Sequence, residues 1–374
     1  MIRLGVDGRE LVIGARTGIG RYVIEVLRAA SQDGWHCTVY GNRSTSLDVT
    51  LSGVTLRIVD RRWTQWWDQV TLPRQLAQDR TSVFLSPYYK GPLRAPCPVV
   101  LTIHDLFFIG YPGSRRPFYD AFMTRLARLY ARCATAIIAD SEYSKRSILE
   151  RLGINPAKIR VIPLPLGSEY HEQPLTDASR VRYGIAEPYI LYVGAFKPHK
   201  NLPRLLQAFA GLGESHRATH QLVLAGGDPS ARPTFQELAR SLGVADRVVF
   251  PGRIDDEDLP ALYSGCALFV LPSLAEGFGL PVLEAMACGA PVIASNHGAI
   301  PEVVGEAAIL FDPENVPAIT AAITTVLAHA ETKATLRQRG LVRSREFSPD
   351  RTARQVLALL REVSEGRCAP RPNS

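Results

Sequence analysis

The sequence predicts an α/β protein of two doubly wound domains, and three observations carry this prediction. Short apolar segments alternate with segments of helical spacing, which is typical of parallel βαβ units. The alternation ends near residue 170 and then begins again. The length of 374 residues is enough for two domains of ordinary size. We expect one domain over residues 1–168 and another over residues 169–349, with a final helix near 350–365 that can pack back on the first.

In the first half, short apolar runs between polar turns predict strands. They cover residues 2–6, 37–40, 82–86, 99–103 and 136–139. Helical spacing of apolar residues predicts helices over residues 20–30 and 118–133. A helix between the last two strands favours a parallel crossover there.

The second half repeats this pattern. Strands are expected over residues 189–193, 221–225, 248–250, 268–271 and 291–294. Helices are expected over residues 202–211, 235–242, 259–266 and 281–288. The boundary between the halves is expected in the proline-containing segment 163–176. Open parallel sheets bind ligands beyond the carboxyl ends of their strands, so two facing sheets predict a cleft that takes two substrates.

The composition, with 46% hydrophobic and 21% charged residues, is that of a globular protein. No run approaches the roughly 20 apolar residues that cross a bilayer. Because residue 1 leads directly into a strand, we expect no secretory signal. The six cysteines are scattered without a C-x-x-C pair. This disfavours a metal site or a disulfide framework and favours a reducing cytoplasm.

The net charge of +7 is unevenly placed. Residues 1–170 hold 23 Lys and Arg against 14 Asp and Glu, and the remaining residues hold 20 against 22. A basic first half suits nucleic acid, anionic lipid or a phosphorylated acceptor. No recognisable nucleic-acid-binding module occurs in the sequence, so we expect no nucleic acid as partner.

The most informative stretch runs from Glu276 to Glu284. Gly277 and Gly279 allow backbone N–H groups to approach a ligand closely. A helix that begins here points its positive end at an anion, typically phosphate. The two carboxylates can accept hydrogen bonds from sugar hydroxyls, so the stretch predicts a nucleotide-sugar site.

A second glycine-rich segment, residues 14–20, matches the G-x-x-x-G-x-G loop of short-chain dehydrogenases. Two observations disfavour that alternative. The expected strand ends several residues before Gly14, and no tyrosine precedes a lysine by four residues. Gly18 and Gly20 can still hold a phosphate or let a sugar approach at the start of the following helix.

Six motifs together resemble the retaining glycosyltransferases of family 4, which have the GT-B fold of two Rossmann-like domains facing a cleft. The motifs lie at residues 17–22, 102–105, 140–145, 192–201, 250–253 and 276–284. Within this family the sequence is most similar to bacterial mannosyltransferases of surface-polysaccharide assembly. The resemblance covers nearly the whole chain and implies a nucleoside diphosphate sugar as donor.

The resemblance assigns roles to individual residues. It implies that Glu284 accepts hydrogen bonds from the ribose, that Glu276 contacts the transferred sugar, and that His104 faces that sugar from the first domain. Lys200 is the cation expected to stabilise the departing diphosphate. The catalytic residues are therefore expected to be His104, Lys200 and Glu276. The remaining donor-binding positions are Gly18, Gly20, Gly194, Arg253, Ile254, Gly277, Phe278, Gly279, Leu280 and Glu284.

This sequence departs from the family pattern at two positions. Ala195 and His199 stand where many members carry arginine, so Lys200 and the glycine-turn amides are expected to carry more of the phosphate charge. The absence of a D-x-D motif agrees with a family that usually needs no metal, and we expect no metal and no other cofactor. A nucleotide-sugar epimerase is the alternative on the same fold.

Two interpretations of a basic and aromatic region remain open. Apolar side chains follow one stripe of the helix expected at 118–133, and arginines follow another; a second cluster precedes them. The residues are Phe118, Phe122, Leu126, Leu129 and Cys133, then Arg125, Arg128 and Arg132, and then Arg61, Arg62, Trp63, Trp66 and Trp67. Either they contact an anionic membrane that presents a polyprenyl-diphosphate-linked acceptor, or the stripe is core and Trp66 and Trp67 pack inside.

Overall fold

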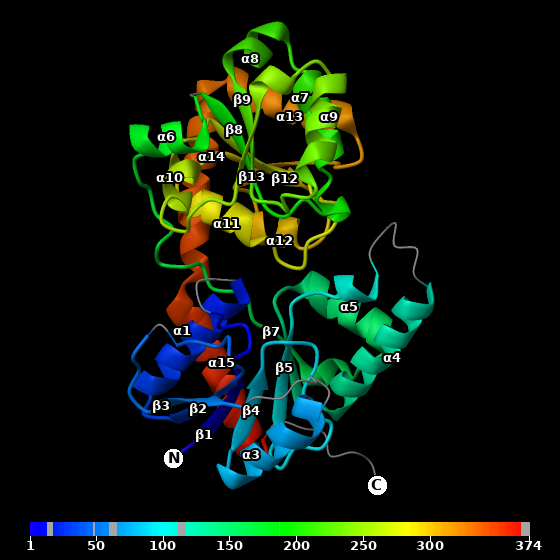
Figure 1. Ribbon diagram of the computed structural model, residues 1–374, viewed down its shortest axis with the longest axis vertical. Coiled ribbons are helices and arrows are strands. Elements are labelled where there is room, and N and C mark those ends of the chain that lie inside the picture. The colour runs from blue at the N-terminus through cyan, green and yellow to red at the C-terminus, as the bar shows by residue number, and fades with distance from the viewer. Residues whose placement is uncertain (13–17, 48, 60–65, 111–116, 187, 368–374) are drawn as a thin grey trace. The chain divides into compact units, whose positions relative to one another are not determined.

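The computed structural model describes residues 1–374 except 13–17, 48, 60–65, 111–116, 187 and 368–374. The chain forms two compact units (Figure 1). Unit 1 is Met1–Pro165 together with the chain from Ser348 onward, and unit 2 is Leu166–Phe347. Each unit contains one parallel sheet with helices, so the predicted α/β fold class is confirmed.

The sheet of unit 1 has seven parallel strands in the order β3-β2-β1-β4-β5-β6-β7. They are β1 (Arg3–Asp7), β2 (His36–Gly41), β3 (Val54–Ile58), β4 (Val83–Ser86), β5 (Val99–Ile103), β6 (Ala136–Ala139) and β7 (Ile159–Val161). Every residue of β4, β5 and β6 is buried, as expected for central parallel strands covered on both faces. The described helices of unit 1 are α1 (Gly18–Gln32), α3 (Leu72–Gln78), α4 (Pro117–Cys133), α5 (Glu142–Leu152) and α15 (Pro349–Ser364).

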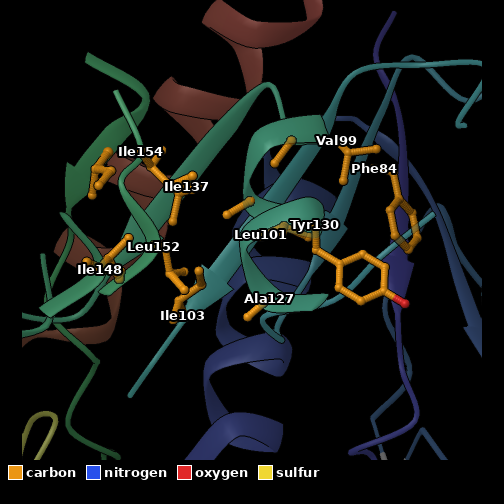
Figure 2. Packing of buried hydrophobic residues seen from close by; sticks show 14 of the residues in the cluster. Phe84, Val99, Leu101, Ile103, Ala127, Tyr130, Ile137, Ile148, Leu152 and Ile154 are labelled. Carbon is orange, nitrogen blue, oxygen red and sulfur yellow. The ribbon is translucent and has the colours of Figure 1, made fainter. Parts of the chain in front are cut away.

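The core on one side of this sheet lies under α4 and α5. Ala127 and Tyr130 of α4 and Ile148 and Leu152 of α5 belong to one buried cluster with residues of β5 and β6 (Figure 2). Apolar residues fill this space because a parallel sheet presents its apolar side chains to helices on both faces.

The sheet of unit 2 has six parallel strands in the order β10-β9-β8-β11-β12-β13. They are β8 (Tyr189–Val193), β9 (Gln221–Ala225), β10 (Val248–Gly252), β11 (Leu268–Leu271), β12 (Val292–Ser295) and β13 (Ala308–Phe311). The helices are α6 (Asp177–Tyr183), α7 (Leu202–Ala210), α8 (Glu214–Thr219), α9 (Arg232–Ser241), α10 (Leu259–Gly265), α11 (Leu280–Ala287), α12 (Ile300–Val304), α13 (Val316–Ala328) and α14 (Ala330–Ser344). The strand order reverses between β8 and β11, and in unit 1 it reverses between β1 and β4.

Helix α9 begins earlier than the sequence pattern predicted, whereas α15 lies within one residue of the expected range 350–365. In both, a proline occupies one of the first two helical positions, where its fixed φ favours the helix and its missing N–H costs nothing. Ser348 caps α15 by accepting a hydrogen bond from Arg351 N at 3.3 Å.

The apolar stripe of α4 is largely exposed, so its interpretation as core is wrong. The exposed fractions are 91% for Phe118, 63% for Phe122 and 45% for Leu129. Cys133 is also exposed, and Leu126 is partly buried against the core. The core-facing side of α4 is instead formed by small residues in the second half of the helix, such as Ala127 and Ala131, both fully buried.

The second basic and aromatic cluster divides between surface and core. Trp67 is buried and donates from Nε1 to the carbonyl of Val59 at 3.0 Å, whereas Trp66 is 55% exposed. The expectation that both pack inside is therefore right for Trp67 and wrong for Trp66. Arg61, Arg62 and Trp63 lie outside the described residues.

The chain passes between the units at two neighbouring points. Leu166 N donates to Phe347 O at 2.9 Å, which joins the first and last residues of unit 2. Beyond this point α15 returns to unit 1 and packs against α1. Arg361 of α15 pairs with Asp33 at 3.2 Å and lies over the Trp35 ring at 5.6 Å.

Candidate functional site

Lys200 and Glu276 lie on two segments that follow the neighbouring strands β8 and β11. The strand order reverses between these two strands, and we call this place the switch point of unit 2. Residues 194–201 follow β8, and residues 272–279 follow β11; we call the latter the β11–α11 loop. Lys200 Nζ lies 2.5 Å from Glu276 Oε1, and the side chains are only 15% and 9% exposed. Ser273 Oγ donates to the same oxygen at 2.7 Å. Glu276 Oε2 is left without a partner among the described residues and can accept from a ligand.

Backbone contacts fix the two segments against each other. Leu274 N donates to His199 O at 2.7 Å. Asn201 has φ of 59° and donates from Nδ2 to Pro272 O at 3.0 Å and to Pro313 O at 2.7 Å. Because Lys200 and Glu276 are each held by such contacts, their pairing does not depend on long flexible loops.

Two glycines allow the chain to approach Glu276 and to begin α11. Gly298 has φ of +69°, and a Cβ there would lie 2.7 Å from both Glu276 N and Glu276 O. Its neighbour Ala299 donates from N to Glu276 O at 3.0 Å. Gly279, with φ of 99°, is the N-cap residue of α11, a conformation that favours glycine.

Glu284 lies on α11 and is 7% exposed. Tyr263 of α10 donates from its hydroxyl to Glu284 Oε2 at 3.0 Å. Burial, followed by the nearby Glu284 charge, raises the pKa of Tyr263, so the phenol stays protonated and keeps donating. The arrangement holds one carboxylate oxygen in place and orients the group as an acceptor.

The other predicted donor-binding residues of unit 2 lie around these loops. Arg253 is exposed and directly follows β10, while the neighbouring Ile254 is buried. Gly277 and Phe278 are buried within the β11–α11 loop, and Leu280 is the first residue of α11. Gly194 directly follows β8, where a Cβ would lie 2.7 Å from the hydroxyl of Tyr192.

His199 adds little positive charge beside Lys200. Burial lowers the pKa of His199, and the Lys200 charge lowers it further. Ala195 is exposed and also carries no charge. The two positions where family members often have arginine therefore supply no fixed cation at neutral pH.

In unit 1, His104 pairs with a carboxylate that sequence reasoning missed. His104 Nδ1 lies 2.7 Å from Asp140 Oδ2, with the side chains 16% and 1% exposed. The rings of His104 and Tyr22 meet edge to face at 6.0 Å. The neighbouring Asp105 accepts from Phe107 N at 3.0 Å and so holds the loop.

Register explains why Asp140 meets His104. In the β5–β6 pair, Ile103 lies opposite Ala139, and His104 and Asp140 are the next residues along each strand. Reading two adjacent parallel strands to their carboxyl ends could have identified this pair from the sequence.

His104 should titrate above its ordinary pKa. Burial lowers the pKa of His104, but the Asp140 charge and hydrogen bond outweigh it and the net shift is upward. Because the folded pKa is raised, the stabilisation is fully present below about pH 6.5 and is lost as pH rises through the folded value. In Asp140→Asn, NMR titration should show a lower His104 pKa, and the stability advantage of the wild type should shrink as pH rises. An unchanged His104 pKa in the variant would contradict this coupling.

Gly18 and Gly20 lie in the first turn of α1, and Gly20 is buried. Tyr22 of the same helix shares a hydrogen bond with Thr102 Oγ1 at 3.1 Å, which ties α1 to β5. Residues 14–17 of the glycine-rich segment lie outside the described residues. In the part of the chain that the structure describes, no group of three or more His, Cys, Asp or Glu side chains could hold a metal ion.

The fold matches solved structures along nearly the whole chain. Sucrose-phosphate synthase from Thermosynechococcus elongatus superposes with a TM-score of 0.79 at 24% identity, covering 98% of this chain and 100% of that one. Anabaena HepE, solved with UDP and glucose, gives 0.76 at 19%, covering 97% and 100%. WaaG, a glycosyltransferase involved in lipopolysaccharide biosynthesis, gives 0.75 at 15%, covering 96% and 99%. These likenesses define a protein of the GT-B class.

Sequence comparison identifies the family within that class. Residues 177–342 match the model of glycosyl transferases group 1, and residues 16–166 match that of glycosyltransferase family 4. The O-antigen chain mannosyltransferase B of Escherichia coli is 32% identical over 261 residues, which are 69% of this chain and 68% of the relative. The serotype-specific mannosyltransferase WbdA of Escherichia coli is 31% identical over 271 residues, which are 69% of this chain but 32% of the relative.

The chain belongs to this glycosyltransferase family and is a hexosyltransferase that acts on saccharides. The resemblance drawn from the six motifs is thereby confirmed.

Proposed function

We propose that this enzyme is a retaining, metal-independent glycosyltransferase that transfers mannose from GDP-mannose to a saccharide acceptor carried on a polyprenyl diphosphate. Its role is in polysaccharide or O-antigen assembly, at the cytoplasmic face of the membrane. The observation that carries the proposal is the placement of Lys200, Glu276 and Glu284 around one glycine turn at a switch point. The mannosyltransferase names of the relatives support mannose as the sugar. GDP-rhamnose and UDP-hexoses are the alternative donors.

The roles follow from charge and reach. Lys200 uses one donor on Glu276 and has two left for the oxygens of a departing diphosphate. The N–H groups of the glycine turn and the N-terminus of α11 add positive potential without a proton transfer. Glu276 Oε2 accepts from a hydroxyl of the transferred sugar, and its charge steadies positive charge near the anomeric carbon.

Asp140 accepts from Nδ1 and raises the pKa of His104, so the doubly protonated ring can donate from Nε2 to a sugar hydroxyl. Nε2 is buried and is paired with no side chain that the structure describes, while Asp140 holds Nδ1. In front-face displacement, the leaving phosphate takes the acceptor proton and the new bond keeps the anomeric configuration. This route needs no protein nucleophile.

A thermal-shift screen over GDP, UDP, ADP and dTDP sugars tests the donor assignment. GDP-mannose should give the largest rise in Tm, because a ligand that binds only the native state stabilises it. NMR of the product formed in the presence of EDTA should show the α anomer. A larger rise in Tm with a UDP-hexose would overturn the assignment of GDP-mannose as donor. A product with inverted anomeric configuration would overturn the retaining mechanism. Conversion of the donor without an acceptor would favour an epimerase.

We further propose that α4 places the enzyme on an anionic membrane. At about 3.6 residues per turn, Phe118, Phe122, Arg125, Leu129 and Arg132 fall on one face, opposite Ala127. All five are exposed, and neither arginine forms an ion pair with a described residue. Exposed aromatic and basic residues on one helical face suit the headgroup region of a bilayer. No described helix is long and apolar enough to cross a membrane.

Reversing the charge on this face should release the enzyme from membranes. Arg125→Glu/Arg132→Glu should lose flotation with anionic liposomes at low salt, since each basic residue contributes about 1 kcal/mol near such a surface. Arg94→Glu/Arg354→Glu, an equal charge change at exposed positions of unit 1 off α4, should still float. Equal flotation of both variants would remove α4 from the docking surface.

A further inference from the structure

Phe347, the last residue of unit 2, contacts the β11–α11 loop directly. Its ring meets that of Phe278 edge to face, with centroids 5.8 Å apart and planes at 75°. Both side chains are nearly buried, at 6% and 5% exposure. Phe278 lies between the two glycines of the loop, so the position of its side chain constrains the backbone conformation at Gly277 and Gly279.

Arg343 holds Phe347 from the other side. Its guanidinium lies 5.0 Å from the centre of the Phe347 ring. The same group donates to Val303 O at 2.9 Å and to Glu302 O at 2.7 Å, which are carbonyls in the last turn of α12. The C-terminus of a helix stabilises a nearby cation, so the Arg343 side chain fixes both the Phe347 ring and the end of α12.

The start of α12 is bound to the same loop. Ala299 N, immediately before this helix, donates to Glu276 O at 3.0 Å. Contacts therefore run in a circuit from Glu276 through α12 and Arg343 to Phe347, and back through Phe278 to the loop. The loop is braced at Glu276 and again at Phe278, on the two sides of Gly277.

Phe347 is also where the chain leaves unit 2. Its carbonyl accepts from Leu166 N at 2.9 Å, so one residue contacts both chain crossovers and the loop. We infer that Phe347, held by Arg343, is a positioning residue that sets the conformation of the β11–α11 loop from the crossover. This inference rests on the proposed function, in which that loop binds the donor.

The physical reason is preorganisation. Amide groups that already point at a phosphate bind it without a further ordering cost, whereas a loosened loop loses that advantage. An aromatic pair contributes about 0.5–1.5 kcal/mol, which corresponds to a factor of about two to twelve in an equilibrium constant.

The test measures loop order and donor binding in the full-length protein. In Phe347→Leu, hydrogen exchange of the amides at 273–279 should be about two- to twelvefold faster. The Kd for GDP-mannose should rise by a similar factor, appearing in KM more than in kcat. Phe311→Leu is the matched control, since Phe311 of β13 is 4% exposed. It should leave both quantities within about twofold.

Two further variants separate positioning from general loss of packing. Phe278→Leu/Phe347→Leu should be no worse than either single variant, because both remove the same contact. Arg343→Gln, at a partly exposed side chain that does not belong to the core, should act in the same direction. Additive effects, or exchange no faster than in Phe311→Leu, would overturn the inference. If the wild type binds no nucleoside diphosphate, the proposed donor site fails, while the exchange rates still decide the positioning role.

Discussion

Lys200→Met should lower kcat by about 10²–10³-fold, the loss typical of removing one preorganised donor from a developing negative charge. We expect turnover to depend on this residue because the two positions where family members often have arginine supply no fixed cation: Ala195 is uncharged, and burial lowers the pKa of His199. Methionine keeps the length and apolar stem of lysine. Steady-state kinetics with a fixed acceptor measures the effect, and turnover at the wild-type rate would remove Lys200 from the mechanism.

The same change should also destabilise unit 2, because it leaves the nearly buried Glu276 carboxylate without its cation. Breaking such a pair costs about 3 kcal/mol or more. Lys200→Met/Glu276→Gln removes both charges and should recover most of the lost Tm without recovering turnover. Recovery of turnover with Tm would mean that the pair serves stability alone.

Glu284→Ala should raise the donor Kd by about a hundredfold or more, while kcat at saturating donor falls less. The estimate corresponds to losing two hydrogen bonds from a charged acceptor, each contributing about 1.5–3 kcal/mol. Isothermal titration with GDP and with GDP-mannose measures the loss. Binding of both ligands should weaken equally, because the family resemblance implies that Glu284 contacts the ribose, which both ligands share.

Tyr263→Phe is the matched control for Glu284. It removes only the hydroxyl that holds Glu284 Oε2 at 3.0 Å, so the donor Kd should rise by about fivefold, the equivalent of about 1 kcal/mol. If Tyr263→Phe weakened donor binding as much as Glu284→Ala does, Glu284 would act by holding α10 in place and not by contacting the ligand.

The fold was predictable where strands are short, apolar and buried throughout. Five strands, β5, β6, β8, β9 and β11, begin and end where the sequence placed them, and all their residues except Val193 and Gln221 are buried. The pattern did not reveal β3, whose residues are mostly exposed and therefore carry no continuous apolar run. Nor did it reveal β7, which has only 3 residues. Edge strands carry the weakest sequence signal because one side of each lacks a neighbour.

The candidate site was predictable where its residues follow strand ends. Lys200 and Glu276 were expected to act together, and the switch-point loops place their charged atoms in contact. Tyr263 and Ser273 were missed, because each acts on a carboxylate from a position with no motif of its own. The exposure of the α4 stripe could not be predicted either. The helical period identifies an apolar face but does not show whether that face packs on the core or faces solvent.

The return of α15 to unit 1 determines the order in which the protein can fold during synthesis. Val356, Leu357, Leu360 and Val363 of this helix are buried, and α15 packs on α1. Unit 1 therefore stays incomplete until residues 349–364 have left the ribosome, by which time all of unit 2 has emerged. Unit 2 is continuous in sequence and can fold first, which reverses the usual N-terminal-first order. Until then, the face of α1 that packs against α15 stays uncovered by that helix.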